Sequence, residues 1–292
     1  MKEEAKMSNK SMIQTTYQLL NGVTIPSIGF GTWQTPDGET AVESVKHAIR
    51  CGYRHIDTAQ GYGNEGSVGK AIRECGIPRE ELFITTKLVN DNHSYDLTMS
   101  SFAESLDKLG LSYVDLFLIH WPNPLPLRDR WEAANAETWK AMEELYEAGK
   151  IKALGISNFR QHHIEALMKT AKIPPMVNQI RLCPGDPQAE LVTYCRSKDM
   201  ILEAYSPLGT GKIFDVPEMQ KLSEKYQRSI AQICIRWSLQ MGFLPLPKSV
   251  TPARIEENLN VFDFELEEAD VQLIADLKGC VGYAGDPDNM PF

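Results

Sequence analysis

Polar residues recur along the chain, and each stands at the end of a short apolar run. They are Asp57, Lys87, His120, Asn158, Gln179 and Lys248. An eight-stranded (β/α) barrel collects side chains from the carboxyl ends of successive parallel strands into a single pocket. An open doubly wound sheet concentrates its site at one switch point instead. Polar residues at so many run ends therefore favour the barrel.

Strand-like and helix-like segments alternate after Pro26. Such alternation requires right-handed crossovers and a parallel sheet. Periodicity alone does not separate a barrel from an open sheet, so the choice between them depends on the polar residues above. The eight expected strands are Ile28–Thr32, Arg54–Asp57, Phe83–Lys87, Leu116–His120, Ala153–Ser157, Met176–Gln179, Ile201–Ala204 and Phe243–Leu246.

The amino-terminal part differs from this repeat. Residues 1–14 lack hydrophobic periodicity, and we expect them to form a disordered tail. Two short apolar runs at 17–20 and 23–25 flank Asn21-Gly22, which predicts a β-hairpin. Residues 15–292 are expected to form one barrel domain. Three glycines, Gly52, Gly110 and Gly149, are expected at helix C-caps.

Composition limits the classes of partner. The chain has 292 residues with a net charge of −9, which argues against general nucleic-acid binding but permits a local basic pocket. No apolar stretch approaches the roughly 20 residues of a membrane span. We expect a cytoplasmic protein without a membrane partner, and a monomer, with a weak dimer as the alternative. Its six cysteines form no CxxC pair, which disfavours a structural zinc site.

Four residues, Asp57, Tyr62, Lys87 and His120, suit the reduction of a carbonyl group. Taken singly, they are better explained by an ion pair and a core histidine. Taken together, they provide a proton donor and its support. A tyrosine of pKa about 10 is more acidic than an alcohol, and a neighbouring ammonium group lowers its pKa further. Asp57 would orient Lys87, while His120 would position the substrate and stabilise its developing negative charge.

The segment Gly52–Glu65, together with Lys87 and His120-Trp121-Pro122, closely resembles the aldo-keto reductase family. The resemblance runs from about Tyr17 to the C-terminus. It implies a (β/α)8 TIM barrel whose hairpin closes the amino-terminal end, with Tyr62 as general acid. It also implies reduction of aldehydes or ketones to alcohols with NADPH and no catalytic metal. The C-terminal loop resembles that of microbial members that reduce keto sugar acids, dicarbonyls and assorted aldehydes.

A basic turn indicates an anion site. Lys248, Ser249 and Arg254 flank Thr251, an expected N-cap, and Pro252 at the first helical position. Backbone N–H groups at such a helix start bind phosphate, although a solvated basic turn would have the same residues. The resemblance assigns this turn to the adenosine 2′-phosphate of NADPH.

The resemblance also assigns contacts along the whole cofactor. Ser157, Asn158 and Gln179 would bond the nicotinamide amide, and Tyr205 would stack on its ring. The expected cofactor-binding residues are Gly31, Thr32, Ser157, Asn158, Gln179, Tyr205, Ser206, Leu208, Lys248, Ser249, Val250, Thr251, Arg254, Glu257 and Asn258. The expected substrate-binding residues are Trp33, Tyr62, His120 and Trp121.

Several observations leave alternatives open. Arg181 and Cys183 stand where the family usually has an acidic residue and a histidine. His55 and Asp57 form an HxD pair, which at a barrel strand end could begin a metal-dependent hydrolase site. A cofactor-binding, redox-sensing subunit with little turnover would also keep the four residues. The GxGxxG match at 61–66 is rejected, because its glycines do not leave a strand directly.

Overall fold

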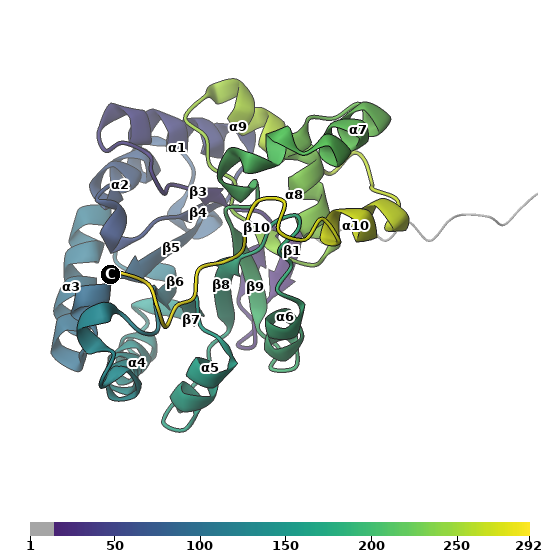
Figure 1. The fold of residues 1–292 in the computed structure, drawn as a ribbon. Helices are drawn as coiled ribbons and strands as arrows, with labels where there is room; N and C mark the ends of the chain where they lie inside the picture. Colours follow the sequence, from purple (N-terminus) through teal and green to yellow (C-terminus); the bar gives the residue numbers. More distant parts are fainter. Residues whose placement is uncertain (1–14) are drawn as a thin grey trace, which may run out of the picture.

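The computed structural model describes residues 15–292, and the tail expected over 1–14 lies outside them. Eight parallel strands form one curled sheet in the order β10-β9-β8-β7-β6-β5-β4-β3, with helices packed around its outer face (Figure 1). The strands are β3 (Phe30–Gly31), β4 (His55–Asp57), β5 (Phe83–Leu88), β6 (Val114–Ile119), β7 (Ile151–Ser157), β8 (Val177–Arg181), β9 (Ile201–Tyr205) and β10 (Leu244–Pro245).

The first and last strands of this sheet close the barrel. The Gly29 N–H donates to the Pro245 carbonyl at 3.1 Å, and the Gly31 N–H donates to the Pro247 carbonyl at 3.0 Å. A Cβ atom on Gly31 would lie 3.1 Å from the Leu246 carbonyl oxygen, so glycine permits this close approach. The expected (β/α)8 barrel is confirmed. Both closing strands are shorter than expected, because their ladder consists of few bonds.

Helices connect the strands and cover the sheet. The α-helices are α1 (Glu39–Cys51), α2 (Glu65–Glu74), α3 (Tyr95–Leu109), α4 (Trp131–Glu147), α5 (Gln161–Met168), α6 (Ala189–Arg196), α7 (Pro217–Tyr226), α8 (Ile230–Gln240), α9 (Pro252–Leu259) and α10 (Glu268–Ala275). The short 3₁₀ helices are η1 (Gln60–Tyr62), η2 (Arg79–Glu81), η3 (Asn90–Asn92), η4 (Leu125–Leu127) and η5 (Gly209–Asp215). No helix within 15–292 is long and apolar enough to cross a membrane.

Glycines end two of the helices as expected. Gly52 after α1 and Gly110 after α3 are left-handed C-caps, with φ of 118° and 65°. Gly149 was expected to be the C-cap of the helix before it, which is wrong by one position. Ala148 is the C-cap of α4, and Gly149 follows it with φ of 69°. The left-handed turn therefore comes one residue after the cap.

The amino-terminal hairpin is present. Its strands are β1 (Thr16–Gln18) and β2 (Thr24–Pro26), and the turn between them is closed by a 2.8 Å bond from the Leu19 N–H to the Val23 carbonyl. Leu19 and Ile25 are buried in an apolar cluster with side chains from the barrel strands, most of them from the amino-terminal halves of those strands. Burial of these side chains excludes water from that end of the barrel.

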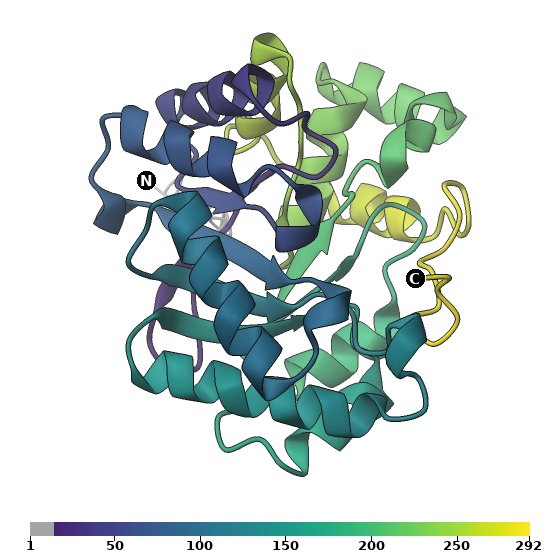
Figure 2. The same cartoon turned by 90° about the vertical axis from the view of Figure 1, so that its left-hand side faces the viewer.

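The opposite end of the barrel carries the C-terminal segment. Figure 2 shows the strand arrows pointing toward the side on which this yellow segment lies. The Leu125 N–H, after β6, donates to the Phe292 carbonyl at 2.9 Å. Arg181, at the end of β8, donates to the Gly282 carbonyl at 3.0 Å. The segment therefore borders the carboxyl ends of the strands, where barrels place their sites.

Candidate active site

Asp57, Tyr62, Lys87 and His120 converge at the carboxyl end of the barrel. Asp57 ends β4, Lys87 lies near the end of β5, and His120 follows β6, whereas Tyr62 comes from η1 after β4. Parallel register aligns these strand ends: Asp57 pairs with Thr85, and Lys87 pairs with Leu118. The carboxyl ends of three strands, together with η1, thus bring the four side chains into one cluster.

Lys87 has a partner for each of its ammonium protons. Its Nζ donates to Asp57 Oδ1 at 2.7 Å, to the Thr58 carbonyl at 2.9 Å and to Tyr62 Oη at 3.1 Å. The side chain is fully buried, so these bonds fix its position. Because the Tyr62 oxygen accepts from Lys87, its own proton is free to be donated elsewhere.

Burial and neighbouring charges shift the pKa values of Lys87 and Tyr62 in opposite directions. Burial opposes the charge of Lys87, but Asp57 and Tyr62 outweigh it and raise the pKa of the ammonium group. Burial also raises the pKa of Tyr62, with Lys87 acting to lower it. The sequence-based expectation considered only the lysine. In the folded protein burial prevails, so Tyr62 is a protonated phenol at neutral pH.

His120 is a neutral imidazole. Burial lowers its pKa to about 3, with repulsion from Lys87 and His93 acting in the same direction. Its ring centroid lies 5.7 Å from that of Tyr62, with an angle of 71° between the planes. A neutral imidazole keeps one N–H donor. His120 and Tyr62 therefore present two polar groups side by side.

A buried layer beneath this cluster was not anticipated from the sequence. Gln179 Nε2 lies 2.9 Å from Asp57 Oδ2 and 2.7 Å from Glu203 Oε2. Glu203 is fully buried, and burial together with repulsion from Asp57 raises its pKa to about 8. Its carboxyl group is therefore mostly protonated at neutral pH. The sequence contains one sign of this buried layer, because Glu203 is an acidic residue within the apolar run 201–204.

The expected nicotinamide contacts lie next to one another. Asn158 has a left-handed backbone, with φ of 63°, and its Nδ2 donates to the His120 carbonyl at 3.0 Å. Its Oδ1 accepts from Tyr205 Oη at 2.8 Å. Ser157 Oγ donates to the Gln179 carbonyl at 2.8 Å. The Tyr205 ring is thus held beside the strand ends that carry His120.

Two further expected cofactor residues lie beside Asp57. Both the amide and the hydroxyl of Thr32 donate to the Asp57 carbonyl, at 3.0 and 2.9 Å. Gly31, its neighbour, pairs with Asp57 in the β3–β4 register. Ser206 follows Tyr205 and has φ of 49°. This strained residue turns the chain away from β9 toward η5.

A cavity of about 390 Å³ lies at the start of α9, and it unites most of the residues expected to bind the phosphate end. It is lined by Leu208, Phe214, Ser229, Ala231, Lys248, Ser249, Arg254, Glu257 and Asn258. Phe214 on η5, and Ser229 and Ala231 at the start of α8, were missed, because these residues carry no phosphate-binding pattern. Val250 and Thr251 are not part of this lining, and Val250 is exposed.

The two basic side chains of this cavity are available to an anion. Across residues 15–292, neither Lys248 nor Arg254 pairs with a carboxylate. Lys248 Nζ donates to the Gln34 carbonyl at 3.1 Å. As expected, Thr251 is the extended N-cap of α9 and Pro252 begins it, although the Thr251 side chain makes no capping bond. A phosphate group suits this set of donors.

Two of the expected substrate residues, Trp33 and Trp121, are at least partly exposed, whereas Tyr62 and His120 belong to the cluster described above. Trp33 is 48% exposed. Trp121 packs edge to face against Phe292, with ring centroids 5.1 Å apart. The C-terminal segment therefore packs against Trp121.

The two departures from the family pattern have structural roles. Arg181 Nη1 lies 2.8 Å from Asp186 Oδ2, and its other bonds reach the carbonyls of Val281 and Gly282. Cys183 is buried, and burial raises the pKa of its thiol to about 12. Arg181 therefore ties the C-terminal segment to the end of β8.

Comparison with known proteins agrees with this geometry. A sequence model described as the Aldo/keto reductase family matches residues 27–278. The chain belongs to the aldo-keto reductase family. It is 44% identical over 280 residues to a protein named glyoxal reductase from Bacillus subtilis, covering 96% of this chain and 99% of the relative. It is 41% identical over 278 residues to methylglyoxal reductase DkgA from Escherichia coli, covering 94% and 98%.

Among solved structures, a variant of Gox0644 in complex with NADPH matches this aldo-keto reductase with a TM-score of 0.88 and 40% identity. The match covers 96% of this chain and 99% of that one. The chain is an NADPH-dependent oxidoreductase. The hydrolase alternative is set aside, because the chain is an oxidoreductase and, within residues 15–292, neither His55 nor Asp57 belongs to a group of three potential metal ligands.

Proposed function

We propose that the protein reduces glyoxal, methylglyoxal and similar small aldehydes to alcohols, with Tyr62 as the general acid. The observation that carries the proposal is the bonding of Lys87, whose Nζ donates to Tyr62 Oη at 3.1 Å. This bond leaves the hydroxyl proton as the one that Tyr62 can give to a substrate oxygen. NADPH, when bound, supplies the hydride that reaches the carbonyl carbon.

The proton from Tyr62 would neutralise the alkoxide as it forms. Its loss leaves a phenolate next to the Lys87 ammonium, which stabilises the new negative charge. Asp57, 2.7 Å from Nζ, keeps Lys87 charged and in place. The pair therefore supports the proton transfer without contacting the substrate.

His120 would orient the carbonyl group toward Tyr62. Since its pKa is lowered to about 3, it remains neutral through the working pH range and offers an N–H donor without a full charge. Donation to the carbonyl oxygen polarises the bond and favours the geometry in which Tyr62 also reaches that oxygen.

The remaining expected residues would hold the cofactor in one orientation. Tyr205 would stack on the nicotinamide, with its hydroxyl held by Asn158 at 2.8 Å. Lys248 and Arg254 would bind the 2′-phosphate in the cavity at the start of α9. Burial lowers the pKa of Lys248, and an anion beside it would act in the opposite direction.

The small-dicarbonyl assignment draws support from two relatives, named glyoxal reductase and methylglyoxal reductase. The test is NADPH consumption by purified protein with glyoxal, methylglyoxal, keto sugars and aromatic aldehydes. We expect the highest kcat/KM with the dicarbonyls. A cofactor-holding regulatory subunit would bind NADPH tightly yet consume it very slowly with every member of the panel.

The role of Tyr62 is tested by Tyr62→Phe. We expect kcat to fall by about 10²- to 10⁴-fold, because the proton donor is removed. The Kd for NADPH, measured by fluorescence titration, should change little. Tyr95→Phe is the matched control, since its hydroxyl bonds Glu144 in an exposed contact and takes no part in the cluster of Asp57, Tyr62, Lys87 and His120. Turnover by Tyr62→Phe within tenfold of the parent would refute the assignment.

A further inference from the structure

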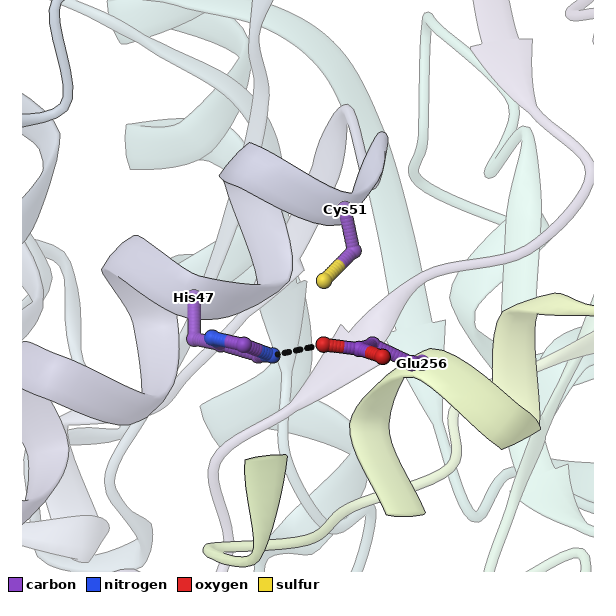
Figure 3. Close-up of side chains that lie close together, drawn as sticks. All are labelled: His47, Cys51 and Glu256. Carbon is purple, nitrogen blue, oxygen red and sulfur yellow. Dashed lines mark hydrogen bonds and ion pairs between the residues drawn. The ribbon is translucent and has the colours of Figure 1, made fainter. Parts of the chain in front are cut away.

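A cluster of three possible ligand residues lies between α1 and α9, outside the catalytic cluster. His47 and Cys51 project from one face of α1 toward Glu256 on α9 (Figure 3). His47 Nε2 is 2.9 Å from Glu256 Oε1. The imidazole nitrogen, thiol sulfur and carboxylate oxygen all lie within 4.8 Å of one another.

The helices themselves bring these donors together. Residues four apart lie on one helix face, so His47 and Cys51 are stacked one turn apart. Helix α1 ends at Cys51 and packs against α9, with Gly52 close to Leu259 at the crossing. The cluster is therefore built on two packed helices, which hold its donors more firmly than loops would.

One nitrogen, one sulfur and one oxygen donor make a set typical of Zn²⁺. We propose that His47, Cys51 and Glu256 form a binding site for a divalent transition metal of the zinc class. Bonds from Zn²⁺ to such donors are about 2.0 to 2.3 Å long, so one ion would lie between donor atoms that are already within 4.8 Å of one another. Binding displaces the thiol proton of Cys51, and three protein ligands leave a fourth position for water.

The other group of potential ligands, His162, His163 and Asp288, has a different explanation. The His163 Nδ1 accepts from the Arg160 N–H at 3.1 Å, so its Nε2 carries the proton. That Nε2 lies 2.9 Å from Asp288 Oδ1 and donates to it. His163 is thus a hydrogen-bond donor that holds the C-terminal segment, and we assign no metal to this group.

No local sequence pattern indicates the site between α1 and α9. The lack of CxxC pairs led to the expectation that no structural zinc is bound. That expectation covers ligands close in sequence, whereas here Glu256 comes from a helix near the other end of the chain. A bound metal would cross-link α1 and α9 and would therefore stabilise the folded state.

The test uses the full-length, reduced, metal-free protein titrated with Co²⁺. We expect about one equivalent to produce a thiolate-to-cobalt charge-transfer band in the near ultraviolet. Cys51→Ser should abolish the band, and Glu256→Gln should weaken Co²⁺ binding by about tenfold or more. Cys75→Ser is the matched control, because Cys75 is also partly exposed but lies outside the cluster, and it should keep the band.

Thermal unfolding provides a second measurement. Zn²⁺ should raise the Tm of the parent and of Cys75→Ser, but not that of Cys51→Ser. Circular dichroism before metal addition checks that each variant is folded. Absence of a thiolate band in the parent, or an unchanged band in Cys51→Ser, would overturn the proposal. Neither measurement depends on reductase activity, so the site and the proposed function can fail separately.

Discussion

Glu203 should make the protein less stable as the pH rises from 4.5 to 8. Its carboxyl group is buried in the barrel, where its pKa rises from 4.5 to about 8. The native protein therefore keeps this proton up to about pH 8, whereas the unfolded chain releases it near pH 4.5. Stability linked to this group is fully present below 4.5 and is lost as the pH rises through the folded pKa.

Glu203→Gln replaces the titrating group with a neutral side chain of similar shape. Each pH unit between the two pKa values corresponds to about 1.4 kcal/mol. At pH 7, which lies 2.5 units above the pKa of Glu203 in the unfolded chain, the parent should have lost about 3 kcal/mol of its free energy of unfolding relative to its value at acidic pH. The variant should not show this loss. Above pH 8 the difference between the two proteins should stay constant.

The assay is urea unfolding of both proteins at pH 5, 6, 7 and 8, with the free energy of unfolding extrapolated to water. Subtracting the two curves cancels the titration of every group that does not interact with Glu203. Glu80→Gln, at an exposed position, is the matched control and should follow the parent. If the Glu203→Gln curve runs parallel to that of the parent, Glu203 is not protonated in the fold and the reasoning fails.

Two further predictions concern the cavity at the start of α9 and a helix contact. Replacing both Lys248 and Arg254 by alanine should raise the KM for NADPH at least tenfold more than the KM for NADH. The reason is that the two positive charges would bind the 2′-phosphate, which NADH lacks. Equal effects on both cofactors would contradict this role. Gly69→Ala should destabilise the protein by about 1 to 3 kcal/mol, since its Cβ would lie 2.2 Å from the carbonyl oxygen at the end of α3. Gly66→Ala, in the same helix with open space around it, should stabilise by about 0.5 to 1 kcal/mol, and thermal unfolding of the two variants checks the opposite signs.

Local patterns predicted much of the fold. The alternation of strand and helix signals placed all eight barrel strands, because a buried parallel strand is a short apolar run. The ends of the closing strands were less accurate: Ile28–Thr32 is reduced to Phe30–Gly31, and Phe243–Leu246 to Leu244–Pro245. Ladder length depends on a partner strand far away in sequence, which a local run does not reveal.

The candidate site was likewise predictable where it depends on local patterns and not where it depends on contacts between distant segments. Residues at strand ends could be named from the sequence, since the fold determines where strand ends meet. The partners of Gln179 and Arg181 could not. Gln179 bonds Asp57 and Glu203, and Arg181 bonds Val281 and its neighbour, all through contacts between distant segments. Such contacts depend on side-chain packing across the barrel, for which a single sequence has no periodic signal.

The hydrogen bonds between β3 and β10 also set an order of assembly. The proposed catalytic residues all lie within the first 120 residues, whereas the lining of the cavity at the start of α9, proposed for the phosphate end of the cofactor, begins at Leu208. A chain that emerges from the ribosome amino-terminus first has the proposed proton donor long before it has the cavity proposed for the phosphate end of the cofactor. The barrel closes only when Gly29 and Gly31 meet the residues of the last strand and its end. A nascent chain halted before β10 would thus carry the tyrosine and lysine without the means to use them.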